Sequence, residues 1–188
     1  MRLPNRPKPG ELLLARPGME ADYWDQAVIL VLDCDDDGAL GVLLNREAEI
    51  ELGQVLPLWS SLVSPPQALF EGGPVSPQGA ICLAQLLDPK EEPPGWRRVH
   101  GELGLLHLDT PVPLVEGAYG ALRIFAGYAG WDSGQLEAEL LRGDWLRVPS
   151  RDEDIFGTEL EGLWQRILRR QGGTLGLLST WTDEPELN

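Results

Sequence analysis

Aspartates 33, 35 and 37 form the densest group of metal-ligand side chains in the sequence. The segment 33–38 reads DCDDDG, which matches the first half of a calcium-binding loop. In such a loop, alternate oxygens from Asp33, Asp35 and Asp37 would converge on one ion. The twelfth position needs a bidentate Glu, and Leu44 stands there. A solvated acidic turn is therefore favoured, and a divalent cation held weakly by these three carboxylates is the alternative.

Nucleophilic catalysis finds little support. The sequence has no G-x-S-x-G elbow, and its two histidines, His100 and His107, would lie on opposite faces of a single predicted strand, where structural roles are favoured. No catalytic residue is assigned. A hydrolase with Glu137 or Glu139 of a predicted helix as general base is the enzymatic alternative. Because residues two apart on a helix point about 200° away from each other, these two carboxylates cannot act as a pair.

Cofactor sites are equally unsupported by the residue types present. Neither phosphate-binding glycine pattern occurs, and two Cys with two His are too few for most zinc sites. We therefore predict no cofactor. Cys34 and Cys82 are interpreted as reduced thiols.

The charge balance argues against a nucleic-acid partner. The chain of 188 residues has 15 Lys and Arg against 30 Asp and Glu, for a net charge of -15. Its one dense basic cluster, Arg166, Arg169 and Arg170, lies at the C-terminal end of a predicted helix, where the helix dipole already favours cations. Direct binding of DNA is the third alternative.

No membrane partner is expected. The longest uninterrupted apolar run, 27–32, has six residues, whereas a membrane-spanning helix needs about 20. The N-terminal residues also lack the apolar stretch of a signal peptide. We expect a cytoplasmic protein.

Hydrophobic patterning predicts strands that lead and helices that close the chain. Strands are expected over 11–15, 27–32, 39–45, 68–71, 80–87, 102–108 and 121–126. The run 27–32 is apolar throughout, so we expect it to be covered on both faces. Asp37-Gly38 predicts a hairpin turn, because glycine adopts the positive φ that tight turns require.

Three helical segments follow from spacing and capping residues. Apolar spacing from Leu52 to Val63 is broken at Pro57. A second helix is predicted from Asp132 as N-cap, with Gln135 completing a capping box, to Gly143. A third is predicted from Thr158 as N-cap, with Glu161 closing the box, an apolar stripe of Leu160, Leu163, Trp164, Ile167 and Leu168, and an end at Gly172-Gly173.

These elements predict one α+β domain over 11–172, with an N-terminal arm at 1–10 and a C-terminal tail at 173–188. Most connections between strands are too short for crossover helices. A mixed, mainly antiparallel sheet flanked by helices is therefore favoured over a doubly wound one.

Glycine-rich and polar segments are the remaining candidates for a functional surface. They are Asn45-Arg46, Gly72-Gly73-Pro74, and the stretch of Gly127, Tyr128 and Trp131 that leads to Gln135 and Glu137. Glycine permits close backbone approach, so each segment could be an architectural corner or a surface that faces a ligand. The architectural interpretation has Gln135 capping a helix, Trp131 filling a core and Asn45 closing a turn.

The sequence resembles the AlgH/YqgE family of bacterial proteins from about residue 10 to residue 168. The resemblance rests on GELLLARPGM, GVLLNR (41–46), EGGPV (71–75) and the long FAGYAGWDSGQLEAEL (125–140). Trp145 and the segment 155–164 fit as well. The proline-rich loops at 64–66 and 88–95 and the acidic turn at 33–37 depart from the pattern.

Membership would imply an α+β fold with a bifurcated, partly barrel-like sheet surrounded by helices, and the resemblance adds no enzymatic role. One branch of the family has been called a transcriptional regulator, a label that fits an indirect effect as well as DNA contact. The leading hypothesis is a cytosolic, non-catalytic binding or regulatory module that contacts a protein or small ligand through the three segments. A homo-oligomer is left open.

Overall fold

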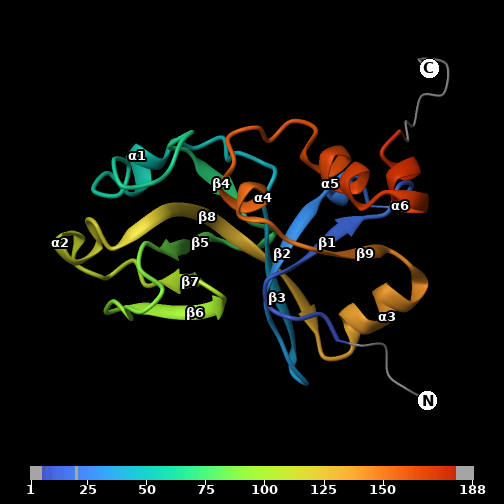
Figure 1. The fold of residues 1–188 in the computed structure, drawn as a ribbon, viewed down its shortest axis with the longest axis horizontal. Coiled ribbons are helices and arrows are strands. Elements are labelled where there is room, and N and C mark those ends of the chain that lie inside the picture. Colours follow the sequence, from blue (N-terminus) through green and yellow to red (C-terminus); the bar gives the residue numbers. More distant parts are fainter. Residues whose placement is uncertain (1–5, 20, 181–188) are drawn as a thin grey trace.

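The computed structural model describes residues 6–19 and 21–180 as one curled sheet with helices against it (Figure 1). The strands are β1 (Glu11–Ala15), β2 (Val28–Cys34), β3 (Gly38–Leu43), β4 (Leu69–Glu71), β5 (Val75–Leu86), β6 (Trp96–His100), β7 (Leu103–Leu106), β8 (Tyr119–Asp132) and β9 (Trp145–Pro149). The helices are the 3-10 helix η1 (Asp22–Trp24), α1 (Leu52–Val55), α2 (Val112–Val115), α3 (Gln135–Arg142), α4 (Asp152–Phe156), α5 (Leu163–Gln171) and α6 (Gly173–Leu178).

The long strand β8 joins the two halves of the sheet. The strand order is β6-β7-β5-β8-β3-β2-β1-β9, and β4 pairs with β8 outside this path. On one side β8 pairs with β5, whereas on the other it pairs first with β4 at 124–126 and then with β3 at 129–132. The sheet therefore forks near residues 127 and 128. Among the described strands only β4 and β8 are parallel, which confirms the predicted mixed, mainly antiparallel α+β fold.

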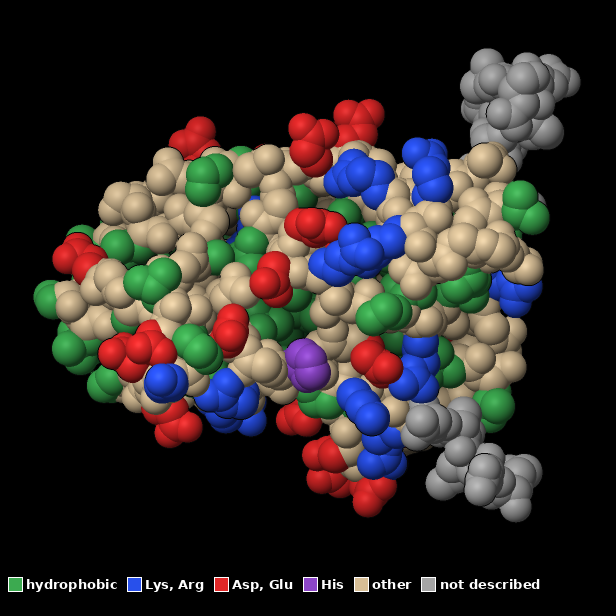
Figure 2. Space-filling view, viewed as in Figure 1, with side chains coloured by type: hydrophobic (Ala, Val, Ile, Leu, Met, Phe, Trp, Pro, Cys, Tyr) green, Lys and Arg blue, Asp and Glu red, His purple; other side chains and the backbone are tan. Residues whose placement is uncertain are grey.

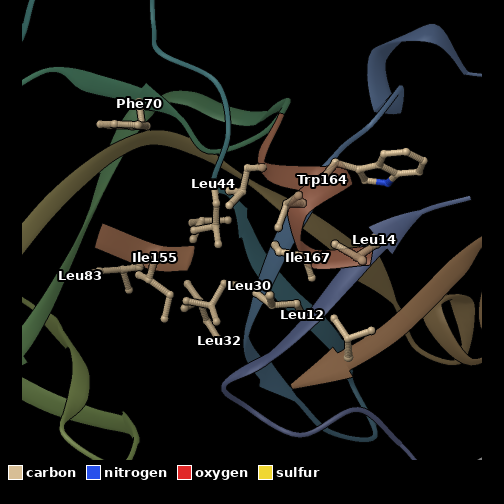
Figure 3. Packing of buried hydrophobic residues seen from close by; sticks show 14 of the residues in the cluster. Leu12, Leu14, Leu30, Leu32, Leu44, Phe70, Leu83, Ile155, Trp164 and Ile167 are labelled. Atoms are coloured by element: carbon tan, nitrogen blue, oxygen red, sulfur yellow. The ribbon is translucent and has the colours of Figure 1, made fainter. Parts of the chain in front are cut away.

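The buried strands β1 and β2 are covered on both faces, as predicted for residues 27–32. Side chains alternate along a strand, so Leu12 and Leu14 of β1 face α5, where they pack with Ile167 and Trp164 (Figure 3). Leu13 and its neighbours face the opposite side, where they pack with residues of α3 and β9. The sheet thus separates two cores. On the α5 side, the Trp164 indole N–H also donates a hydrogen bond to the Ala15 carbonyl of β1, at 2.9 Å.

The helix that precedes β9 begins later than the capping pattern predicts. α3 starts at Gln135, and its N-cap is Gly134, which has a φ of 75°. The predicted N-cap, Asp132, is instead the last residue of β8. The Gln135 side-chain oxygen still accepts a hydrogen bond from the Asp132 N–H at 3.0 Å. One of the two hydrogen bonds of the predicted capping box is therefore present, and it links the end of β8 to the first residue of α3.

The C-terminal helix differs in the same way. α5 begins at Leu163 after Gly162, whose φ of 71° interrupts the helix that Thr158 and Glu161 were predicted to cap. Four residues of the predicted apolar stripe, Leu163, Trp164, Ile167 and Leu168, are buried in the core, whereas Leu160 precedes the helix and is only partly buried. Packing of the stripe, rather than the capping sequence, decides where the helix starts.

Six short elements were not predicted from the sequence: η1, α2, α4, α6, the exposed edge strand β6 and strand β9. Each has too few residues to show a period. α6 occupies the start of the predicted tail 173–188, while 181–188, like residues 1–5 of the predicted arm, lie outside the described residues. The break at Pro57 is confirmed, since α1 ends at Val55 and only turns follow.

Candidate functional site

The Gly72-Gly73-Pro74 segment packs directly against Gly127 and Tyr128 at the fork of the sheet. A Cβ on Gly72 would lie 2.2 Å from the Gly127 carbonyl oxygen, and one on Gly73 would lie 2.2 Å from the backbone carbonyl of Tyr128. The Gly72 N–H donates to the Ala126 carbonyl at 2.8 Å. Two of the three predicted segments therefore meet, and glycine is required because the backbones touch.

Asn45 and Arg46 hold the neighbouring turn. The Asn45 side-chain oxygen accepts from the Val28 N–H at 3.1 Å, and its amide donates to the Gln26 carbonyl at 2.9 Å. Arg46 donates to the Tyr23 carbonyl, and its guanidinium carbon lies 4.8 Å from the centre of the Tyr23 ring. Asn45 thus has the architectural role that the sequence allowed, whereas Arg46 fixes a tyrosine.

Tyr23 links η1 to β4 through a hydrogen bond that sequence patterns missed. Its hydroxyl donates to Oε1 of Glu71. Partial burial, together with this bond to a carboxylate, raises the pKa of Tyr23, because both disfavour the phenolate. The only sequence signal for this residue was an aromatic pair, Tyr23-Trp24, inside an acidic loop.

Beside this pair lies a hollow of about 780 Å³, which we call the apolar groove. It is lined by Tyr23, Ala48, Glu49, Ile50, Val55, Leu56, Leu69, Glu71, Gly73, Pro74, Pro77, Gln78, Gly79, Ala80 and Ala126. β4 contributes Leu69 and Glu71 to its lining, and the segment 77–80, which leads out of the bulge between Val75 and Ala80 in the pairing of β5 with β8, supplies one wall. Gly73 and Pro74 are the predicted site residues that line it.

Trp131 and Gln135 line a different hollow, of about 570 Å³, which we call the tryptophan pocket. Its lining residues are Gly18, Met19, Ala21, Trp24, Gly130, Trp131, Gln135, Glu139, Arg142, Asp144 and Trp145. Tyr128 lines a third hollow beside the acidic turn. The predicted residues are therefore neighbours along the chain and around the fork, but they do not share one hollow, although Trp131 lines both the tryptophan pocket and the third hollow.

The helix carboxylates Glu137 and Glu139 have unrelated partners. Glu137 accepts a hydrogen bond from Arg6 Nε at 3.1 Å, and Arg6 also pairs with Asp36. Oε2 of Glu139 accepts from the indole N–H of Trp131 at 2.8 Å. These contacts agree with the expectation that the two carboxylates do not form a pair.

The prediction that the histidines lie on one strand is wrong. His100 ends β6 and His107 follows β7, because a turn at Gly101 reverses the chain between them. The short β6 hairpin was hidden from the pattern by its exposed, basic sequence. His107 Nδ1 lies 3.5 Å from a carboxylate oxygen of Asp109, and both side chains are exposed.

The acidic turn folds its carboxylates onto its own backbone. Asp35 accepts from the Asp37 N–H at 2.8 Å, and Asp33 accepts from the Cys34 N–H at 3.0 Å. Within the ranges 6–19 and 21–180, no three His, Cys, Asp or Glu side chains are grouped as metal ligands. The predicted hairpin between β2 and β3 is confirmed.

Basic side chains gather over α4 and α5, with acidic ones among them (Figure 2). Arg170 forms a two-pronged ion pair with Asp154, at 2.8 and 2.7 Å, and Arg166 donates to the carbonyls of Glu159 and Glu161. Much of the cluster therefore holds the 157–162 loop and α4 against α5. In the described part of the chain, no helix is long and apolar enough to cross a membrane.

Comparison with known proteins places this fold among bacterial relatives. A UPF0301 protein of Streptomyces coelicolor is 45% identical over 182 residues, covering 95% of this chain and 94% of the relative. A UPF0301 protein of Thermobifida fusca is 42% identical, with 95% and 94% covered.

Two solved structures share the architecture. The crystal structure of a Corynebacterium diphtheriae protein superposes with a TM-score of 0.87 at 29% identity, covering 94% of both chains. The solution structure of the AlgH protein from Pseudomonas aeruginosa gives a TM-score of 0.69 at 27% identity, with 93% of this chain and 94% of that chain covered. A family model described as AlgH-like matches residues 12–176. The chain therefore belongs to the AlgH-like family.

Proposed function

We propose that this protein is a non-catalytic binding module, and that its apolar groove docks an extended apolar segment of a partner protein that carries a basic side chain. The observation that carries the proposal is the combination, in one groove, of exposed aliphatic side chains with carboxylates that have no basic residue beside them in the lining. A module of this kind would influence transcription only through its partner.

The aliphatic rim supplies affinity. Ile50 is 54% exposed and Val55 is 49% exposed, although both line a concave surface. Full burial of such a side chain stabilises by about 1.5–3 kcal/mol, so the half-exposed state of each costs the free protein about half of this stabilisation. Covering these two side chains is a driving force for docking.

The charge of the groove selects the partner. Its lining contains Glu49 and Glu71 and no Lys or Arg. Tyr23 engages Oε1 of Glu71, which leaves Oε2 able to accept from a cation. The net charge of -15 favours approach of a basic segment through long-range attraction.

The backbone beside the groove favours an extended partner. On the side away from β8, β5 pairs with β7 only at 82–85. Among the described strands, none therefore flanks residues 76–80 on that side, and residues 77–80 of this stretch line the groove. An extended peptide can add to such an edge through backbone hydrogen bonds.

The test is site-specific photocrosslinking in cells. A photoreactive phenylalanine analogue replaces Ile50 in one variant and Leu114, which is 49% exposed on α2 away from the groove, in the control. The expected result is an adduct at position 50 and none at position 114. The crosslinked partner segment, mapped by mass spectrometry, should combine apolar residues with Lys or Arg.

A synthetic peptide of the mapped segment then provides the quantitative step. We expect Ile50→Asp to weaken its binding at least tenfold, and Leu114→Asp to leave it unchanged. Equal labelling at both positions, an adduct to a second copy of this chain, or a mapped segment without a basic residue would each overturn the proposal.

A further inference from the structure

The tryptophan pocket is a second hollow, formed where η1, the end of β8, α3 and the start of β9 meet. It is separate from the apolar groove, since the two share no lining residue. Three of the seven Trp side chains in the sequence, Trp24, Trp131 and Trp145, line it together with Glu139. Its volume of about 570 Å³ lies in the range of small-molecule sites.

Glu139 is held in place by three neutral donors. Its Oε2 accepts from the indole N–H groups of Trp131 at 2.8 Å and Trp145 at 2.7 Å. Its Oε1 accepts from the Gln135 amide at 2.9 Å. A carboxylate offers about four acceptor positions, so about one remains on a side chain whose orientation is already fixed.

The charge of Glu139 has no ion-pair partner among the described residues. The single basic lining residue, Arg142, donates twice to Asp144, at 3.0 and 2.7 Å. The described lining thus has two carboxylates and one guanidinium. One negative charge, which lies on Glu139, is stabilised by hydrogen bonds alone.

Aromatic rings form the walls around this charge. Trp145 packs edge to face with Trp24 at 5.7 Å and with Trp131 at 5.9 Å between ring centres. Trp131 is 7% exposed and Trp145 is 3% exposed, whereas Trp24 is only partly buried. Trp24 is therefore the ring with surface left for a ligand. Indole faces attract organic cations through their electron-rich π systems.

We propose that the tryptophan pocket binds a small organic cation with an alkylated ammonium group. The Glu139 carboxylate supplies the counter-charge, and Trp24 supplies a cation-π contact. A metal ion fits less well, because Ca²⁺ or Mg²⁺ needs about six oxygen ligands, whereas the described lining offers two carboxylates, of which Asp144 is already paired with Arg142. Alkylated ammonium matches both parts of the lining, since its charge is spread over an apolar surface.

Choline is the probe, and 3,3-dimethyl-1-butanol is its neutral isostere. The full-length protein, labelled with ¹⁵N, is titrated with each compound while the indole N–H signals are followed by NMR. KCl is matched throughout to hold ionic strength constant. We expect saturable shifts of the Trp131 and Trp145 signals with choline and none with the neutral alcohol.

Two variants and one control locate the interaction. Glu139→Gln keeps an oxygen acceptor but removes the charge, and should weaken choline binding at least tenfold. Trp24→Leu keeps an apolar wall but removes the indole face, and should weaken binding severalfold. Glu137→Gln, two residues away on α3 and bonded to Arg6 outside the pocket, should leave binding unchanged.

The proposal fails if the signals do not shift saturably with choline, or if the neutral isostere shifts them equally. It also fails if Glu139→Gln remains folded and binds as wild type does. If Glu139→Gln does not fold, the proposal is tested by the comparison of choline with its neutral isostere and by Trp24→Leu. Unchanged choline binding by Trp24→Leu then overturns the proposal.

Discussion

The guanidinium carbon of Arg123 lies 4.3 Å from the centre of the Phe70 ring, inside the protein. Arg123 is 1% exposed, and no carboxylate in the described part of the chain forms an ion pair with it. Its N–H groups bond instead to four backbone carbonyls, those of Pro65, Ile155, Phe156 and Gly157. Burial lowers the pKa of this guanidinium, and the cation joins β8 to α4 and to the 64–67 loop.

Replacing this cation should loosen α4. We expect Arg123→Met to lower the free energy of unfolding by about 2–3 kcal/mol, because carbonyls that it satisfies lose their donors in a buried setting. Arg97→Met, on the exposed strand β6, should change it by less than about 0.5 kcal/mol. Urea unfolding followed by circular dichroism measures both. Equal stability of the two variants would contradict the anchoring role.

The ion pair between Asp154 and Arg170 should be a major link between α4 and α5. The Asp154 side chain is 3% exposed, and it also accepts from the Arg151 N–H at 2.8 Å. We expect Asp154→Ala to lower the free energy of unfolding by about 3 kcal/mol, because Arg170 would stay largely buried with only the exposed Glu153, at 4.0 Å, as counter-ion.

Asp152→Ala, which removes an exposed carboxylate from the same helix, is the matched control and should cost about 1 kcal/mol or less. A double-mutant cycle with Arg170→Met, measured by urea unfolding, isolates the pair. Additive effects of the two substitutions would show that the pair contributes nothing.

Close backbone contact at the fork should make Gly73 intolerant of any side chain. A Cβ there would overlap the Tyr128 carbonyl, so Gly73→Ala must move one of the two strands. We expect a loss of about 3 kcal/mol. Gly101→Ala serves as control, because Gly101 has a positive φ of 56° but nothing within 4 Å of its Cβ position.

Gly101→Ala should lower the free energy of unfolding by only about 1–2 kcal/mol, which is the strain of a left-handed backbone at a non-glycine residue. Thermal unfolding of both variants under identical conditions tests the difference. If Gly101→Ala loses as much stability as Gly73→Ala, the loss at residue 73 comes from its backbone conformation and not from its close approach to Tyr128.

The buried thiol of Cys82 should make stability depend on alkaline pH. Cys82 is 2% exposed, and burial raises its pKa from 9.0 to about 12. Because the folded-state pKa is the higher one, the unfolded chain releases its proton first. This stabilising contribution is complete below pH 9 and is lost as pH rises from 9 towards 12.

At pH 10 the loss amounts to about 1.4 kcal/mol. The measurement compares Cys34→Ala with Cys34→Ala/Cys82→Ala, both with reductant, by urea unfolding at pH 8 and pH 10. The single variant should lose about 1.4 kcal/mol more than the double variant over this range. Parallel pH profiles would show that Cys82 does not titrate differently in the folded protein.

Local patterns in the sequence predicted the elements that have a period or a strong turn signal. Strand β2, the hairpin at Asp37-Gly38 and the buried stripe around Trp164 all follow from apolar spacing or from glycine at a turn. Helix starts were predicted less well. The capping pattern predicts a start at Thr158, whereas α5 begins after Gly162, where its apolar stripe packs on β1 and β2.

The sites depend on contacts between residues far apart in the chain. Tyr23 and Glu71 are 48 positions apart, and no local period links η1 to β4. Arg123 did carry a signal, as a lone charge in an apolar strand, but its carbonyl partners could not be read from spacing.

By itself, the sequence determined most of the strands, the acidic turn, the charge and the motifs of the family, because these depend on residue type and on neighbours within a few positions. Only the tertiary structure decided that β8 is the fork, that Gly73 lies in one hollow while Trp131 lies in another, and that Glu139 receives two indole donors. The physical reason is that strand pairing and side-chain packing are satisfied over the whole chain at once, so the partners of a buried polar group depend on the global arrangement rather than on its local sequence.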